Sequence, residues 1–183
     1  ALLTSHRVAT PHTYPSLSEE VYEFVTDTMM TMLHSGLWPD PLAQGSRTQG
    51  NPRAIDGIIV LDPTGRVVVA SPNANSMYTR MGMTGYLEKR NLADVTRAML
   101  SSGEEADETL QLVLAGRSDL RTELTIARAR VTMRAIPLLK QKGAHIERLG
   151  ALILCRDVTE LRRREMELMT KDATIREIHH RVK

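Results

Sequence analysis

Between residues 55 and 156, short apolar runs and turn residues alternate in an order that few folds allow. Two strand patterns come first, at residues 55–61 and 66–70, and the turn between them has proline and glycine where a hairpin needs them. Short helical patterns follow, and three more strand patterns come after those. This order predicts an α/β fold of the α+β type, with one antiparallel sheet of five strands and short helices.

Three short helices are expected between the hairpin and the last three strands. Residues 91–100 and 104–115 have the apolar spacing of the second and third helices, and Gly116 ends the third. Ser71 is placed to cap the first helix. Its apolar face consists of Ala74, Met77, Tyr78 and Met81. We expect these side chains to be plain core, although Met77, Tyr78 and Met81 could also line a small apolar pocket.

The last three strands differ in how their apolar residues are spaced. Residues 120–126 and 131–135 alternate apolar and polar side chains, whereas residues 150–156 are more uniformly apolar. A strand that is apolar on both faces is covered on both faces, so residues 150–156 are expected to be the more central strand.

The first 53 residues have a different organisation. Residues 1–7 resemble a short strand, and a helix is expected to begin at a capping Ser18 and to end before Gly36. Residues 39–53 contain proline, glycine, serine and glutamine without apolar periodicity, which is typical of a linker.

Composition excludes several classes of protein. The 183 residues are 42% hydrophobic and 25% charged, which is typical of a globular chain, and a net charge of +2 implies no strong attraction to nucleic acid. A single cysteine excludes an intrachain disulfide framework and suits a reducing cytoplasm. No apolar run is long enough to span a bilayer and no signal peptide opens the chain, so we expect a soluble, cytoplasmic protein without a membrane partner.

Residues 158–183 have the pattern of a long charged helix. Apolar residues recur there every seven positions: Leu161, Leu168, Ile175 and Val182. Arg164 and Lys171 occupy two of the intervening positions, so the apolar seam is imperfect. Two interpretations stay open, a parallel coiled coil with a weak seam and a single solvated helix.

The helix pattern ends in the string Glu-Ile-His-His-Arg-Val-Lys, residues 177–183. If Leu161 is heptad position a, His179 falls at e beside the seam and His180 falls at f, which faces outward. Glu177 lies one turn before His180 on the same face and could orient its ring or accept its proton. Arg181 could neutralise a phosphate. The alternative is a pair of surface histidines without a chemical role.

Other site types have little support in the sequence. Adjacent helical residues diverge by ~100°, so His179 and His180 cannot hold one metal ion together. No nucleotide-binding glycine motif is present. Cys155 is expected to be a buried small side chain. The basic run Arg162 to Arg164 is balanced by nearby glutamates and is expected to be a solvated face that binds no nucleic acid.

Several motifs between residues 54 and 159 resemble a PAS domain. They are Asp-Gly-Ile-Ile-Val-Leu-Asp at residues 56–62, Ala-Ser-Pro-Asn-Ala at 70–74, and Arg-Asp-Val-Thr-Glu-Leu at 156–161. The last contains the Asp-x-Thr that ends the final PAS strand and begins the output helix. The resemblance implies a five-stranded sheet with a cleft that senses a ligand or supports dimerisation. It supports no flavin or haem, because the reactive cysteine motif and the helix-borne histidine of such domains are absent.

The terminal string resembles the phosphoacceptor box of bacterial sensor histidine kinases, and the whole chain resembles actinobacterial soluble GAF–PAS sensor kinases. The resemblance implies that residues 1–38 are the end of a GAF domain, 39–53 a linker, 54–159 a PAS sensor, and 160–183 a signalling helix that begins the phosphoacceptor helix. It also implies a homodimer. The box selects His180 as the phosphoacceptor, with His179 as the runner-up, although Arg181 stands where many such kinases have an acid.

This resemblance predicts the function of the parent protein. The parent would use ATP and Mg²⁺ to phosphorylate its own histidine and would pass the phosphoryl group to a response-regulator aspartate. In such kinases the regulator typically has an ANTAR domain that binds RNA. The chain by itself is expected to be inactive and to hold no cofactor. The alternative is a non-enzymatic PAS module that binds a ligand or dimerises within a transcriptional or second-messenger regulator.

Overall fold

The computed structural model describes residues 17–38, 51–100 and 108–181, with side chains described as far as Thr174. The predicted strand at residues 1–7 lies outside the described residues, and so does nearly all of the predicted linker.

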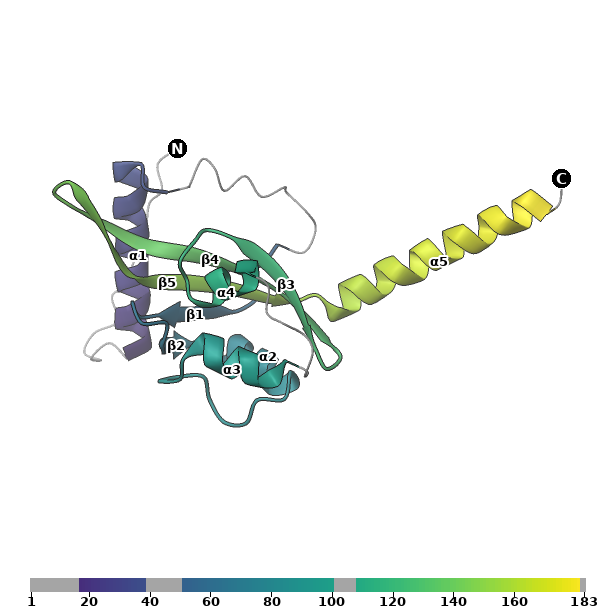
Figure 1. Cartoon of the computed structure of the whole chain (residues 1–183), viewed down its shortest axis with the longest axis horizontal. Helices are drawn as coiled ribbons and strands as arrows, with labels where there is room; N and C mark the ends of the chain where they lie inside the picture. The colour runs from purple at the N-terminus through teal and green to yellow at the C-terminus, as the bar shows by residue number, and fades with distance from the viewer. Residues whose placement is uncertain (1–16, 39–50, 101–107, 182–183) are drawn as a thin grey trace, which may run out of the picture.

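The core of the molecule is a five-stranded antiparallel sheet (Figure 1). The strands are β1 Ile58–Leu61, β2 Val67–Ala70, β3 Arg121–Ile126, β4 Ala129–Lys142 and β5 His145–Asp157. Their order across the sheet is β2-β1-β5-β4-β3. The predicted fold is therefore confirmed, and β5 lies between β1 and β4, in the middle of the sheet as its apolar sequence indicates.

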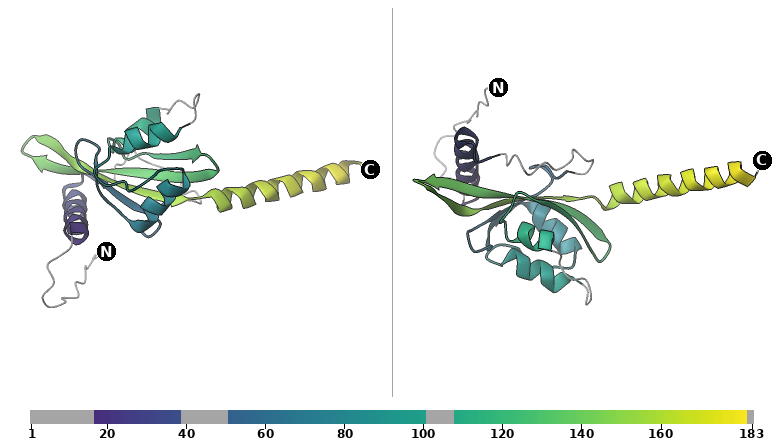
Figure 2. Two further views of the ribbon diagram at one scale, coloured as in Figure 1. Left: turned by 90° about the horizontal axis from the view of Figure 1, so that it is seen from below. Right: turned by 45° about the horizontal axis from the view of Figure 1, so that its top comes forward.

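Helices cover both faces of this sheet. They are α1 Leu17–Ser35, α2 Pro72–Arg80, α3 Leu92–Met99, α4 Glu108–Leu114 and α5 Thr159–Arg181. The right-hand view of Figure 2 shows α1 on one side of the sheet and the group α2 to α4 on the other. The last helix, α5, continues from the end of β5 and points away from the sheet (Figure 1).

The face that α2, α3 and α4 cover contains the larger core. Alternate strand residues such as Ile59, Met133 and Ile153 point into it and are fully buried. Tyr78 is also fully buried, and its hydroxyl group lies 2.9 Å from the Thr96 Oγ1 atom. The Ser71 side chain accepts a hydrogen bond from the Ala74 amide, so the predicted cap of α2 is confirmed. The apolar face of α2 belongs to the core, as expected.

The opposite face, which we call the outer face, is covered by α1. Val25 of α1 packs there against Val60, Ile136, Leu138 and Leu152. These strand residues have the opposite parity to those of the larger core, so every second side chain faces each cluster. Helix α1 therefore packs on the same sheet that α2 to α4 cover from the other side.

The boundaries of several predicted elements were wrong. The first strand starts at Ile58, and Ile55 lies in a preceding turn with 80% of its surface exposed. Ser18 lies inside the first turn of α1, because that helix begins at Leu17. The start of the predicted helix at 104–115 lies outside the described residues and is not tested; the helix is described from Glu108 to Leu114.

Strands β4 and β5 are much longer than predicted and pair along almost their whole length. Their register runs from Val131 opposite Asp157 to Lys142 opposite His145, where a turn with Gly143 joins them. The side chains from Lys140 to Glu147 are exposed on both faces. Because neither face is buried, this part of the hairpin has no apolar alternation from which it could be predicted.

Candidate functional site

The Asp-x-Thr sequence lies at the junction between the sheet and the long terminal helix. Strand β5 ends at Asp157 and α5 begins at Thr159, as the motif predicts. Asp157 Oδ1 accepts hydrogen bonds from the Thr159 amide, at 2.9 Å, and from the Thr159 hydroxyl group, at 2.6 Å. A carboxylate that accepts from the first amides of a helix satisfies donors that the helix itself cannot. We call residues 157–162 and their partners the junction.

The second oxygen of the same carboxylate reaches a different element. Asp157 Oδ2 lies 3.1 Å from Nη2 of Arg80, the last residue of α2. The Arg80 side chain is 60% exposed, so this ion pair is screened by solvent. The pair adds little stability, but it helps to fix positions, because one carboxylate connects the end of β5, the end of α2 and the start of α5.

Strand β4 holds the same turn through its backbone. The Arg130 amide donates to Thr159 Oγ1 at 2.9 Å, and the Arg130 carbonyl accepts from the Val158 amide at 2.8 Å. Val158 is buried between them. The chain therefore leaves the sheet in a fixed direction, because both sides of this turn are bonded to one residue of the neighbouring strand.

The first turn of α5 is also tied to the edge strand β3. Arg162 Nη2 lies 2.7 Å from Glu123 Oε2, and Arg162 Nη1 lies 2.7 Å from Glu165 Oε2. These hydrogen bonds, first those to Glu123, raise the pKa of the Arg162 guanidinium. The predicted solvated basic run is thus paired at Arg162 and at Arg163, which meets Glu160 and Glu167.

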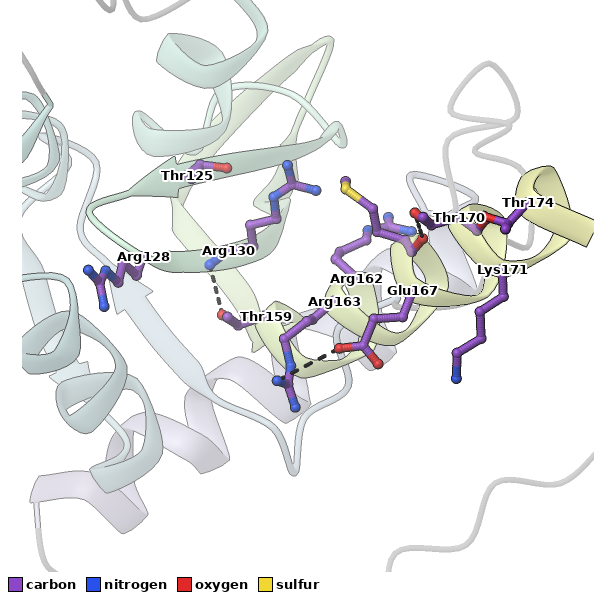
Figure 3. A pocket seen from close by; sticks show the side chains of 11 residues that line it. Thr125, Arg128, Arg130, Thr159, Arg162, Arg163, Glu167, Thr170, Lys171 and Thr174 are labelled. Carbon is purple, nitrogen blue, oxygen red and sulfur yellow. Dashed lines mark hydrogen bonds and ion pairs between the residues drawn. The ribbon is translucent and has the colours of Figure 1, made fainter. Parts of the chain in front are cut away.

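Beside the junction, a groove of about 850 Å³ lies between the β3–β4 turn and one face of α5 (Figure 3). Met166, Thr170 and Thr174 of α5 line it at four-residue spacing, opposite Thr125 and Arg130 of the sheet. The Thr170 and Thr174 hydroxyl groups donate to backbone carbonyls one turn earlier. The exposed lining of the groove is largely apolar, although several of its lining residues, such as Arg128 and Lys171, are charged.

The predicted phosphoacceptor residues lie in the last two turns of α5. Glu177, His179, His180 and Arg181 all have helical backbone, but their side chains are outside the described part of the structure. Helical geometry places Glu177 and His180 on one side, three residues apart. The heptad seam also stays a prediction, although Leu168 is 63% exposed and free to meet a partner helix.

Cys155 is fully buried, as expected, and burial first of all raises the pKa of its thiol to about 12. Within the described ranges, no group of three His, Cys, Asp or Glu side chains is placed to hold a metal ion.

Two polar contacts of the outer face escaped the sequence analysis. Trp38 Nε1 donates to Asp119 Oδ2, and Glu123 receives Arg162 of α5. These pairs are separated by 81 and 39 residues. A single sequence contains no signal for such distant partners. The sequence shows only that Asp119 is an acid next to a strand whose outward positions are mostly charged or polar, and this does not identify its partner.

The junction, the sheet order and the covering helices together agree with a family model described as the PAS fold, which matches residues 53–163. The chain belongs to the PAS family. The predicted PAS interval, residues 54–159, lies within the matched interval.

The relatives of this PAS chain are sensor kinases. The sensor histidine kinase PdtaS of Mycobacterium tuberculosis is 45% identical over 169 residues, which are 90% of this chain and 33% of that protein. The protein of the same name from Mycolicibacterium smegmatis is 40% identical over 186 residues, covering all of this chain and 36% of that protein. The chain thus spans about a third of the length of the curated relatives it matches.

A solved structure described as the sensor region of a sensor histidine kinase is also similar. It is 39% identical, has a TM-score of 0.66, and the match covers 82% of this chain and 55% of that one. This chain therefore corresponds to the PAS-containing sensor region of such kinases. No helix within the described residues is both long enough and apolar enough to cross a membrane.

Proposed function

We propose that this chain is the signal-input region of a cytoplasmic, two-component histidine kinase, and that α5 transmits the state of the PAS domain to a phosphoacceptor histidine. The observation that carries the proposal is the junction. It fixes the start of α5 to β3, β4, β5 and α2, and the helix then continues without a break from Thr159 to Arg181, through both candidate histidines.

In this proposal His180 is the phosphoacceptor. Its neutral imidazole nitrogen attacks the γ-phosphoryl group of ATP in line, a bond to that nitrogen forms, and ADP leaves. Glu177 orients the ring or accepts its proton, and Arg181 stabilises the transferring phosphate. His179 is the runner-up. ATP and Mg²⁺ are held by a further domain of the longer parent protein, so this chain alone has no kinase activity.

The partners follow from the same proposal. The parent forms a homodimer through α5 and passes its phosphoryl group to an aspartate of a response regulator, whose output domain is an RNA-binding ANTAR domain. Residues 1–38 are the end of an upstream GAF domain, joined to the PAS domain by residues 39–53, and residues 160–183 begin the phosphoacceptor helix. The PAS interior binds neither flavin nor haem, so the purified chain should show no absorption band of either cofactor.

The non-enzymatic alternative is not favoured by the relatives, which are named as kinases. Sequencing the parent gene beyond Lys183 separates the two functions. The kinase requires Asn-Asn-Leu directly after Lys183 and an ATP-binding domain further on. A DNA-binding or cyclase domain in that place would contradict the kinase.

Purified full-length parent, incubated with Mg²⁺ and γ-phosphate-labelled ATP, should then acquire label on histidine. Labelled phosphohistidine is stable in base and labile in acid. A parent that acquires no label under conditions in which it binds ATP would contradict the proposed function.

A further inference from the structure

Trp38, three residues after the end of α1, is attached to the segment that enters β3. Trp38 Nε1 donates to Asp119 Oδ2 at 3.1 Å, and Asp119 lies two residues before the first residue of β3. The Asp119 side chain is only 4% exposed, and Arg134 of β4 also donates to both of its oxygens, at 2.8 and 2.9 Å. The indole is therefore bonded to a buried acid that is also paired with β4, so Trp38 is attached to the segment that enters β3.

The start of α5 is attached to the same strand, four residues further on. Glu123 receives Nε and Nη2 of Arg162, at distances from 2.7 to 3.3 Å. The side chains of both Arg162 and Glu123 are less than one third exposed, which limits screening by solvent. Glu123 alternates with the core residues Leu124 and Ile126 and so faces the outer side of β3. Asp119 reaches the same side, because its partner Trp38 packs against the outer-face cluster. Figure 1 shows α1 and α5 at opposite ends of the sheet, with no contact between them.

The position of β3 at the edge of the sheet makes it easier to displace than a central strand. It is an edge strand that pairs only with β4, from Arg121 opposite Arg134 to Ile126 opposite Ala129. A central strand would have to break two hydrogen-bonded ladders to shift, whereas an edge strand strains one. The chain bends at Asp119 and enters β3 two residues later, and the Leu120 carbonyl between them already accepts from the Ala135 amide of β4. Only three residues separate Asp119 from Glu123, so a displacement of Asp119 acts directly on the start of the strand.

We propose that β3 is a mechanical link between the two helices, through Trp38 and Asp119 at one end and Glu123 and Arg162 at the other. A displacement of the end of α1 moves β3 and, with it, the first turn of α5. A signal that arrives upstream of α1 thereby reaches α5 across the outer face, without any ligand in the PAS interior. This inference concerns only the described chain and holds whether or not the parent is a kinase.

Amide hydrogen exchange in this chain tests the link. Trp38→Phe keeps the ring but removes the donated hydrogen bond. The amides of the first turns of α5, starting with the Arg162 amide that donates to the Val158 carbonyl, should then exchange about fivefold faster, the factor expected for the loss of one hydrogen bond. The amides of α3, which contacts neither helix end, should be unchanged.

Two further variants make the result decisive. Leu33→Ala changes a partly exposed side chain of α1 that is not in the link, and it should leave exchange in α5 unchanged. Glu123→Ala cuts the link at its other end, and Trp38→Phe should then have no additional effect on α5. Unchanged exchange in α5 with Trp38→Phe would overturn the proposal. An equal effect of Leu33→Ala on exchange in α5 would also overturn it. So would an undiminished effect of Trp38→Phe in the Glu123→Ala background, because the free-energy effects of distant, unlinked substitutions simply add.

Discussion

Asp157 and Thr159 are joined by two hydrogen bonds to a single carboxylate oxygen, one from the backbone amide and one from the hydroxyl group of the threonine. The other oxygen of Asp157 meets Arg80, and the threonine hydroxyl oxygen in turn accepts from the Arg130 amide. Two side chains thus connect two strands and two helices. The direction in which α5 leaves the sheet depends on this pair.

Asp157→Ala should lower the free energy of unfolding by about 1 kcal/mol, the usual cost of a lost helix cap, since the exposed pair with Arg80 adds little. Asp157→Asn should retain part of the cap and lose less. The measurement is the urea midpoint with an unchanged m-value. Asp94→Ala is the control, because that exposed acid pairs with Arg97 within a single helix. Equal midpoints for Asp157→Ala and Asp94→Ala would contradict the account of the junction.

Gly150→Ala should be strongly destabilising. Gly150 has a φ of +154°, and a Cβ atom there would collide with the Leu61 carbonyl oxygen of β1. Backbone strain and the steric clash together predict a loss of about 3 kcal/mol or more in unfolding free energy. Gly143→Ala is the matched control. Its φ is +61° with open space around it, so only about 1 kcal/mol of strain is expected there. Similar losses at the two positions would show that β1 and β5 are not packed as described.

Cys155 should make the stability of the fold depend on alkaline pH. Burial raises the pKa of its thiol from an ordinary 9.0 to about 12 in the folded chain. Between these values the unfolded chain has already lost the proton that the folded chain keeps. The contribution of the thiol to stability is therefore fully present below pH 9 and is lost as the pH rises towards 12. Urea midpoints at about pH 8 and pH 10 should fall more for the wild type than for Cys155→Ala. An equal fall in both would mean that the thiol is not buried.

Helices and strands with one buried face have a regular apolar spacing, and these elements could be predicted from the sequence. Segments without a buried face could not. The caps at Ser71 and at Asp157 with Thr159 act on amides two or three residues away, so these roles can be inferred from local sequence. The contacts of the same junction with Arg80 and Arg130 cannot. The half of the β4–β5 hairpin near its turn has no buried face. Its strands are held together by backbone hydrogen bonds, which any residue can make and which therefore give no sequence pattern. The Trp38–Asp119 and Glu123–Arg162 contacts require the folded sheet to bring them together. The seam and the histidines of α5 are still predictions.

Leu168→Asp, with or without Ile175→Asp, should convert a dimer into a monomer, because the carboxylates would face each other across the predicted seam. Met169→Asp is the control, since Met169 is also largely exposed but lies one residue outside the seam. Light scattering at high concentration measures the mass. A monomeric wild type, or equal effects of the two changes, would contradict the coiled coil.

If α5 connects the PAS domain to a phosphoacceptor histidine, as proposed, then labelling of the full-length parent with γ-phosphate-labelled ATP should depend on His180. His180→Gln should abolish labelling, His179→Gln should only weaken it, and Glu177→Gln should slow it, since Glu177 tunes the imidazole without accepting the phosphoryl group. Label that persists in His180→Gln, or that is lost only in His179→Gln, would contradict the assignment.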